Sequence, residues 1–231
     1  MTAAQRRMLI IGLVPFLALV IVGASVTVSL IRGKLPYSYS AAFAPGPQGV
    51  RVTSDVSAQL LASADEKVHV TVDGSYAVAQ PDVQITTVDG MLTVRISCPD
   101  LHCAVDLTVA VPGTVVVQAK VENASLNADG LASPITVNVS GGSVDMTQLR
   151  SPQVSVEAAR GSISLIFDGA PTRVTATASD GSLSVQLPRT TTYAIDAVSA
   201  QGSNQVNIPN DPSSTNHIYL RSSYGSITVD G

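Results

Sequence analysis

Apolar and polar residues alternate along most of the chain beyond residue 49, and glycine interrupts the alternation at nearly regular intervals. Around Gly181, apolar or small residues lie seven, five and three positions before the glycine and two and four positions after it. Side chains of one parity share one face of a strand, so this spacing predicts two strands, each with an apolar face, on either side of a turn. The inward set is Val174, Ala176, Ala178, Leu183 and Val185.

The same set recurs at intervals of about twenty residues. The place of the glycine is taken in turn by Glu122, Gly142, Gly161, Gly181, Gly202 and Gly225. Successive origins are 20, 19, 20, 21 and 23 residues apart. Glycine suits a turn residue with positive φ, and Asp-Gly pairs, which occur six times, favour such turns. A nearly constant period of this length is the signature of a repeat architecture.

Two all-β architectures fit the repeat. Stacked coils of about twenty residues would form a β-solenoid, whereas consecutive hairpins would form a β-sandwich. The constant inward set favours the solenoid, because stacking places equivalent residues above one another. The segment around Gly90 follows the same register before an irregular insertion. A solenoid's last coil is an open edge, so we expect the C-terminal coil to pair with a partner or a second copy.

The amino-terminal part has a different pattern. Residues 8–31 form an uncharged, largely apolar run of 24 residues, which predicts one transmembrane helix. A cleaved signal peptide and a buried helix are the alternatives. We therefore expect a cytoplasmic tail at 1–7, a linker rich in Pro, Gly and Ser at 32–48, and an extracytoplasmic β-repeat domain at 49–231. The free amino terminus and the two cysteines favour this single-pass orientation in the cell membrane.

Composition narrows the core and the partners. The chain is 45% hydrophobic but only 4% aromatic, so the core is expected to consist of branched aliphatic side chains and alanine. Beyond Lys34 there are nine basic and seventeen acidic residues, a formal charge of −8. Nucleic acid is excluded as a partner, because phosphate binding needs clustered Lys and Arg and no basic stripe is visible in the sequence.

With these features, the chain resembles the putative-adhesin family of bacterial β-strand-repeat proteins. The resemblance lies in "VPGTVVVQAKVENASLNADGLASPITVNVSGGSVDMTQL" and in the Gly-Ser-apolar-polar-apolar units that follow, through "YGSITVDG". It covers roughly residues 50–231. It implies a surface-exposed β-repeat domain linked to adhesion or to envelope stress, and it supplies no catalytic residues.

The only cysteines, Cys98 and Cys103, are close in sequence. Outside the cytoplasm such a pair is typical of a disulfide that closes a small loop. A redox-active pair is less favoured because the spacing is not Cys-x-x-Cys. A metal site with His102 is also less favoured, because only three candidate ligands lie together.

Other candidate chemistry is sparse. His69, His102 and His217 are scattered, without a metal-binding spacing. Asp145 and Glu157 have outward parity in neighbouring coils, and a close carboxylate pair could cleave glycosidic bonds. The Asp-Gly turns could bind Ca²⁺, although turn geometry explains them without a metal. We expect no cofactor.

The sequence therefore favours a non-catalytic, adhesin-like binding module at the cell envelope, with an envelope glycan or a membrane protein as partner. The first alternative is a structural or regulatory component of an envelope-stress system. The second is a polysaccharide-active solenoid enzyme.

Overall fold

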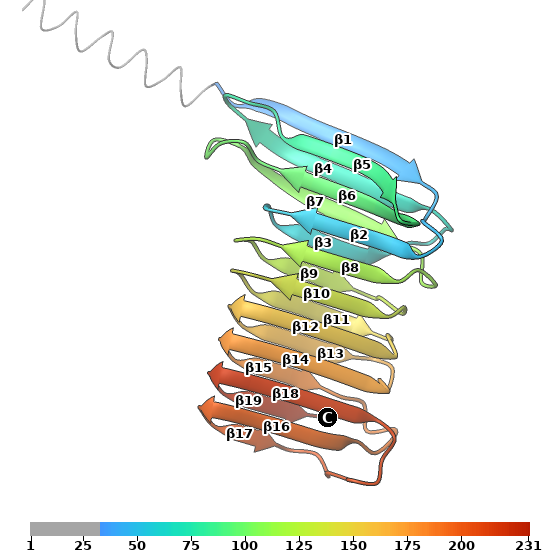
Figure 1. The fold of residues 1–231 in the computed structure, drawn as a ribbon, viewed down its shortest axis with the longest axis vertical. Helices are drawn as coiled ribbons and strands as arrows, with labels where there is room; N and C mark the ends of the chain where they lie inside the picture. The colour runs from blue at the N-terminus through green and yellow to red at the C-terminus, as the bar shows by residue number, and fades with distance from the viewer. Residues whose placement is uncertain (1–32) are drawn as a thin grey trace, which may run out of the picture.

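The computed structural model describes residues 33–231, which form nineteen strands in two facing sheets and contain no helix (Figure 1). The all-β expectation is confirmed for this part of the chain. The expected tail at 1–7 and membrane helix at 8–31 lie outside the described residues. Within 33–231, no helix has the length and hydropathy needed to cross a membrane.

One sheet, called sheet A, has ten strands. In spatial order these are β1 (Leu35–Phe43), β4 (Val68–Tyr76), β7 (Ala104–Val111), β3 (Ala58–Ala62), β9 (Leu126–Asp129), β11 (Val144–Leu149), β13 (Ile163–Phe167), β15 (Leu183–Gln186), β19 (Ile227–Asp230) and β17 (Asn204–Val206). Only β4 pairs antiparallel, with β1 on one side and β7 on the other. All other pairings in this sheet are parallel.

The facing sheet, called sheet B, has nine strands. In spatial order these are β16 (Ala194–Gln201), β18 (His217–Tyr224), β14 (Arg173–Asp180), β12 (Gln153–Arg160), β10 (Ile135–Val139), β8 (Val117–Val121), β2 (Gly49–Ser54), β6 (Met91–Ser97) and β5 (Asp82–Val88). Only β5 and β6 pair antiparallel. Both sheets are therefore mixed, with a long parallel portion.

The parallel portion follows the twenty-residue register. In β12 and β14, Val154 lies opposite Val174 and Val156 opposite Ala176, as equivalent positions of neighbouring repeats should. The strands on either side of Gly161, β12 and β13, lie in different sheets. Each repeat thus crosses from sheet B to sheet A at its glycine, and the consecutive hairpins of the sandwich alternative do not form there.

The repeat that was assigned to Glu122 is displaced by two residues. Val117, rather than Val115, lies opposite Ile135, and Leu126 lies opposite Val144. Because the displacement is an even number, the inward face is unchanged and only the stacking partner differs. The true counterpart of the turn glycine is the residue two positions later, Ala124.

The unit around Gly90 also departs from the expected register. Its strands β5 and β6 form an antiparallel hairpin in one sheet, instead of crossing between sheets. Asp89 and Gly90 both have positive φ, at 50° and 75°. Positive φ at both central residues is the geometry of a tight two-residue hairpin turn, which the repeat glycines do not form.

The expected linker at 32–48 is wrong over most of its length. Strand β1 covers nine of these residues and pairs antiparallel with β4. Tyr37, Tyr39 and Phe43 share one parity and pack against the core. This period-two signal was obscured by the neighbouring Pro, Gly and Ser residues, which are typical of linkers.

One continuous core fills the space between the sheets. It is almost wholly aliphatic, as the composition predicts, and the inward residues of the central coils are buried. Tyr193 and Phe167 are the buried aromatic residues within 33–231. The outward residues of the same strands are mostly Ser, Thr, Asn, Gln and Asp.

The C-terminal coil does not form the end of the stack, so the premise of its expected pairing with a partner or a second copy is wrong. Strand β18 lies between β14 and β16, and β19 lies between β15 and β17. Both of its edges are therefore paired. The outermost coil is the preceding one, formed by β16 and β17 (Figure 1). Its edge is partly covered, because the Asn210 side chain bonds both the N–H and the carbonyl oxygen of Ile195.

Candidate functional site

The repeat glycines form a column in which each backbone closely approaches the next coil. A Cβ atom on Gly161 would lie 2.1 Å from the carbonyl oxygen of Gly142, and one on Gly181 would lie 2.1 Å from that of Gly161. A Cβ atom on Gly142, Gly225 or Gly202 would lie 2.2 Å from a neighbouring carbonyl oxygen. Side chains do not fit at these distances.

Positive φ, the reason expected from the sequence, applies to only part of this column. Gly142, Gly161 and Gly225 have φ between 120° and 149°, but Gly181 and Gly202 do not have positive φ. The close backbone approach is common to all five glycines. Their role is therefore architectural, and neither a Ca²⁺ site nor any other chemistry is needed to explain them.

Cys98 and Cys103 are joined in a disulfide with a Cα–Cα distance of 5.6 Å. The bridge connects the end of β6 in sheet B with the start of β7 in sheet A. Asp55 accepts a hydrogen bond from the Cys98 amide at 3.0 Å. This bond connects the disulfide loop to the turn between β2 and β3. The pair thus secures an irregular connection between the two sheets.

The three histidines lie in different environments. His69 contacts Asp65 at 2.9 Å, and this hydrogen bond, followed by one from the Lys67 amide, lowers the pKa of Asp65 to about 2. His102 lies 3.7 Å from Asp100. His217 stacks on another residue, Tyr219, as described below. Within 33–231, no three His, Cys, Asp or Glu side chains are grouped as a metal site would require.

Asp145 and Glu157 do not form a pair. Asp145 lies on β11, in sheet A, in register with Asn127 and Ser164. Glu157 lies on β12, in sheet B, where it accepts a hydrogen bond from Asn138 at 3.1 Å. Outward parity was predicted correctly, but each coil crosses between sheets, so outward residues of consecutive strands point to opposite sides.

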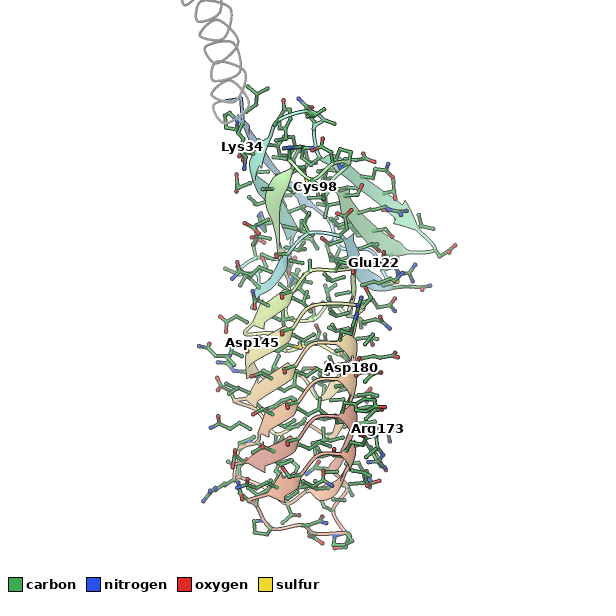
Figure 2. The ribbon with its side chains drawn as sticks, turned by 90° about the vertical axis from the view of Figure 1, so that its left-hand side faces the viewer. Lys34, Cys98, Glu122, Asp145, Arg173 and Asp180 are labelled. Atoms are coloured by element: carbon green, nitrogen blue, oxygen red, sulfur yellow. A yellow bond between two sulfur atoms is a disulfide. The ribbon has the colours of Figure 1, made fainter. Side chains whose placement is uncertain are left out.

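The two outer faces differ in charge, which the sequence reasoning missed. The strands of sheet A, all within the described range, carry five carboxylates and no Lys or Arg; these are Asp73, Asp106, Asp129, Asp145 and Asp230. The strands of sheet B carry four carboxylates and six basic residues, which are Arg51, Arg95, Lys120, Arg160, Arg173 and Arg221. Figure 2 shows Asp145 and Arg173 on opposite sides of the stack. Sorting alternate strands of the repeat into two sets would have revealed this difference.

Sheet B presents an in-register line of outward side chains, which we call the B row. It runs across six neighbouring strands and consists of Arg51, Gln118, Thr136, Ser155, Thr175 and Tyr219. Gln118 accepts hydrogen bonds from the Arg51 guanidinium at 3.1 and 3.2 Å. Arg173 and His217 flank the row beside Thr175 and Tyr219.

Two shallow depressions follow this part of sheet B. One, of about 210 Å³, is lined by residues that include Thr136, Ser155 and Arg173. The other, of about 260 Å³, is lined by residues that include His217, Tyr219 and Asp196. Asp196 is held by Arg221, whose hydrogen bond lowers the pKa of this carboxyl group. The aspartate is thus ionised but paired with a cation.

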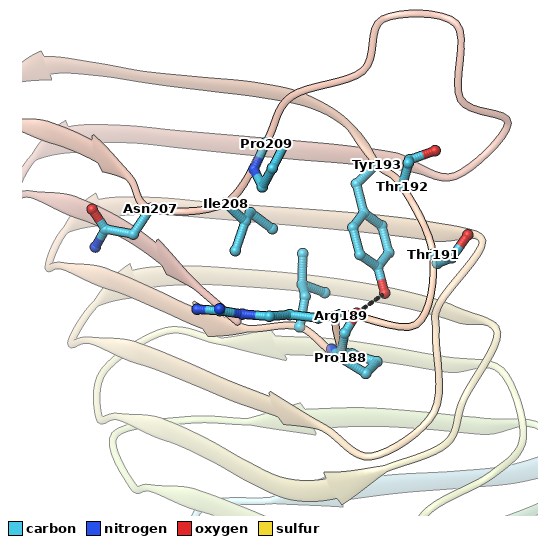
Figure 3. A pocket seen from close by; sticks show the side chains of 9 residues that line it. Pro188, Arg189, Thr191, Thr192, Tyr193, Asn207, Ile208 and Pro209 are labelled. Atoms are coloured by element: carbon cyan, nitrogen blue, oxygen red, sulfur yellow. Dashed lines mark hydrogen bonds between the residues drawn. The ribbon is translucent and has the colours of Figure 1, made fainter.

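A more apolar pocket of about 290 Å³ lies near the end of the stack, between the loop after β15 and the loop after β17 (Figure 3). The buried Tyr193 forms one wall and donates a hydrogen bond to the carbonyl oxygen of Pro188 at 2.9 Å. Burial raises the pKa of Tyr193. The lining has one charged side chain, Arg189, and no carboxylate or histidine to act with it as an acid–base pair.

Comparison with known proteins shows that solved structures share this fold. No protein-family model and no curated protein matches the sequence. A solved structure described as a putative cell adhesion protein from Clostridium sporogenes matches with a TM-score of 0.55 and 16% identity, over 85% of this chain and 99% of that one. A putative adhesin from Bacteroides fragilis matches with a TM-score of 0.51 and 14% identity, over 84% and 97%. At these identities the likeness shows a shared fold alone.

Proposed function

We propose that this chain is a membrane-anchored β-solenoid that acts as a non-catalytic, adhesin-like binding module at the cell envelope. One observation carries the proposal: the stack has two long faces on which short polar side chains stand in register from coil to coil. Such rows offer hydroxyl and amide groups at a fixed spacing, which suits an extended partner better than a small substrate.

Two further observations support this function. The uncharged run at 8–31 has the length of a membrane-spanning helix and would hold the domain at the envelope surface. Two solved structures with a similar fold are described as a putative cell adhesion protein and a putative adhesin. Opposite placement of Asp145 and Glu157 removes the specific acid pair on which the enzyme alternative depended.

The test uses the full chain in lipid nanodiscs and two fractions of a bacterial envelope, one of polysaccharides and one of membrane proteins. We expect saturable retention of the polysaccharide fraction without a change in polymer length. Retention of a membrane protein alone would favour the envelope-stress alternative. Shortening of the polymer during incubation would favour the enzyme alternative.

A further inference from the structure

We infer that the B row is the docking surface for a linear anionic polysaccharide that lies across the strands, along the axis of the stack. This inference rests on the proposed binding function and names the class of ligand and the face that takes it. The occupant is a chain of sugar units that bear carboxylate or sulfate groups.

The B row is long and narrow. Its six strands are hydrogen-bonded neighbours, and adjacent strands in a sheet lie about 4.8 Å apart. The B row is therefore about 24 Å long and one side chain wide. An extended polymer that lies along the row passes one coil after another. Each coil from Gln118 to Thr175 offers it an amide or a hydroxyl group.

The charge of the B row suits an anionic ligand. None of the six residues in the B row is a carboxylate, and the row has Arg51 at one end and Arg173 beside Thr175 near the other. Among the described residues, Arg173 forms no ion pair, so its guanidinium is available to an anion. The planar guanidinium group of Arg173 can donate two parallel hydrogen bonds to a carboxylate or a sulfate group.

Of the two carboxylates near the row, one is paired with a cation and the other accepts a hydrogen bond from a neutral amide. Asp196 lies next in line beyond Tyr219 and is paired with Arg221. Glu157 lies two residues along β12 from Ser155 and accepts a hydrogen bond from Asn138. The strands of sheet A carry aspartates and no Lys or Arg, so charge complementarity selects sheet B.

An aromatic surface lies at one end of the B row. The ring of Tyr219 is stacked on that of His217, with centroids 6.0 Å apart and an interplanar angle of 18°. Tyr219 is 40% exposed, so the pair presents a supported aromatic surface beside a depression. An aromatic side chain of this kind has an apolar body and a polar tip, which match the apolar face and hydroxyl rim of a sugar ring.

A nucleic acid fits this surface less well. Its binding needs many phosphate contacts at once, whereas the B row and its flank supply two guanidinium groups and a histidine. The described domain is also acidic overall, and its long-range field repels a polyanion of high charge density. Sparse charge and many hydroxyl groups favour a glycan.

The experiment measures binding of the full chain in nanodiscs to polygalacturonate, a sparsely sulfated dextran, uncharged dextran and duplex DNA. We expect saturable binding to at least one of the two anionic polysaccharides, weakened by salt, and none to uncharged dextran or DNA. Arg173→Ala should raise the Kd about tenfold, since a charge-assisted hydrogen bond contributes about 1.5 kcal/mol. Tyr219→Ala should raise it by a similar factor, and Arg173→Lys should raise it less.

The matched control is Arg150→Ala, which removes an exposed arginine from the turn between β11 and β12, outside the B row. We expect an unchanged Kd and, for every variant, an unchanged circular dichroism spectrum. Equal effects of Arg173→Ala and Arg150→Ala would overturn the inference, as would binding to DNA at the same affinity. Failure with these anionic polymers while the envelope polysaccharide fraction is still retained would overturn the B row assignment and leave the binding function standing.

Discussion

The central coil formed by β12 and β13 and the outermost coil formed by β16 and β17 occupy the same positions of the repeat. In the central coil the inward residues are all buried and apolar; they are Val154, Val156, Ala158, Ile163 and Leu165. In the outermost coil the corresponding residues are at most half-buried and include two polar ones; they are Ile195, Ala197, Ser199, Asn204 and Val206. A central coil is covered on both sides, whereas the outermost coil is covered on one.

This difference shows that a position in the repeat does not by itself determine how deeply its side chain is buried. The same parity places Leu165 and Val206 on inward faces, but only Leu165 is fully excluded from water. Polar residues are tolerated where the next coil is missing, because solvent can satisfy them. The ends of the stack are therefore expected to be less stable than its middle.

The largest effect is expected when a buried side chain in the middle of the stack is shortened. Leu165→Ala should lower the free energy of unfolding by about 3 kcal/mol, because it leaves a cavity in a fully buried site. Val206→Ala, in the outermost coil, should cost less than about 0.5 kcal/mol. Urea unfolding followed by circular dichroism measures both values. Equal costs for the two variants would contradict a stability gradient along the stack.

The next largest effect is expected when a methyl group is added to a glycine of the column. Gly161→Ala places Cβ 2.1 Å from the Gly142 carbonyl oxygen at a φ of 120°, with coils on both sides, and should cost about 2.5 kcal/mol. Gly202→Ala meets the same kind of contact at 2.2 Å, but its coil can shift outward. We expect less than half the cost, from thermal unfolding midpoints. A larger loss for Gly202→Ala would show that the outermost coil is rigidly held.

A third effect concerns the irregular amino-terminal end. Replacing both Cys98 and Cys103 by serine should cost about 2 kcal/mol, the chain-entropy value for a loop this short. Amide exchange should accelerate in β6 and β7 and remain unchanged in β13 and β15. Uniform acceleration through the central coils would show that the two regions unfold as one unit.

The smallest effect is a pH dependence in the turn between β3 and β4. Because the folded pKa of Asp65 is lowered to about 2, this group stabilises the fold above its unfolded pKa of about 3.9. That contribution is lost as the pH falls through about 2. His69→Ala should move the Asp65 pKa upward, which carboxyl NMR titration measures. An unchanged pKa would assign the shift to the hydrogen bonds from Lys67 and Ser63 instead.

Much of the fold could be predicted from local pattern. Parity identified the inward residues of every regular repeat, and even the repeat assigned to Glu122, whose stacking partner was displaced by two residues, kept its correct face. The separation of Asp145 from Glu157 was also within reach, since consecutive strands of a coil alternate between sheets. Tyr37 and Tyr39 carried a strand signal that the linker-like composition obscured.

The order of the coils could not be predicted in the same way. Parallel ladders join backbone groups, and coils of equal length offer nearly the same hydrogen bonds to any neighbour. Chain order alone therefore suggested that the C-terminal coil lies outermost. Ser199 and Asn204, polar residues at inward positions, were the available signal that the preceding coil occupies the exposed end.

By itself, the sequence determined the period, the inward face of each strand and the aliphatic core, because these depend on the parity of neighbouring residues. Only the tertiary structure decided which coils are neighbours and where Arg173 lies beside the stacked pair of His217 and Tyr219. These features depend on contacts between residues about twenty to forty positions apart. Local periodicity does not reveal such contacts, because it depends on where a side chain points and not on what lies beside it.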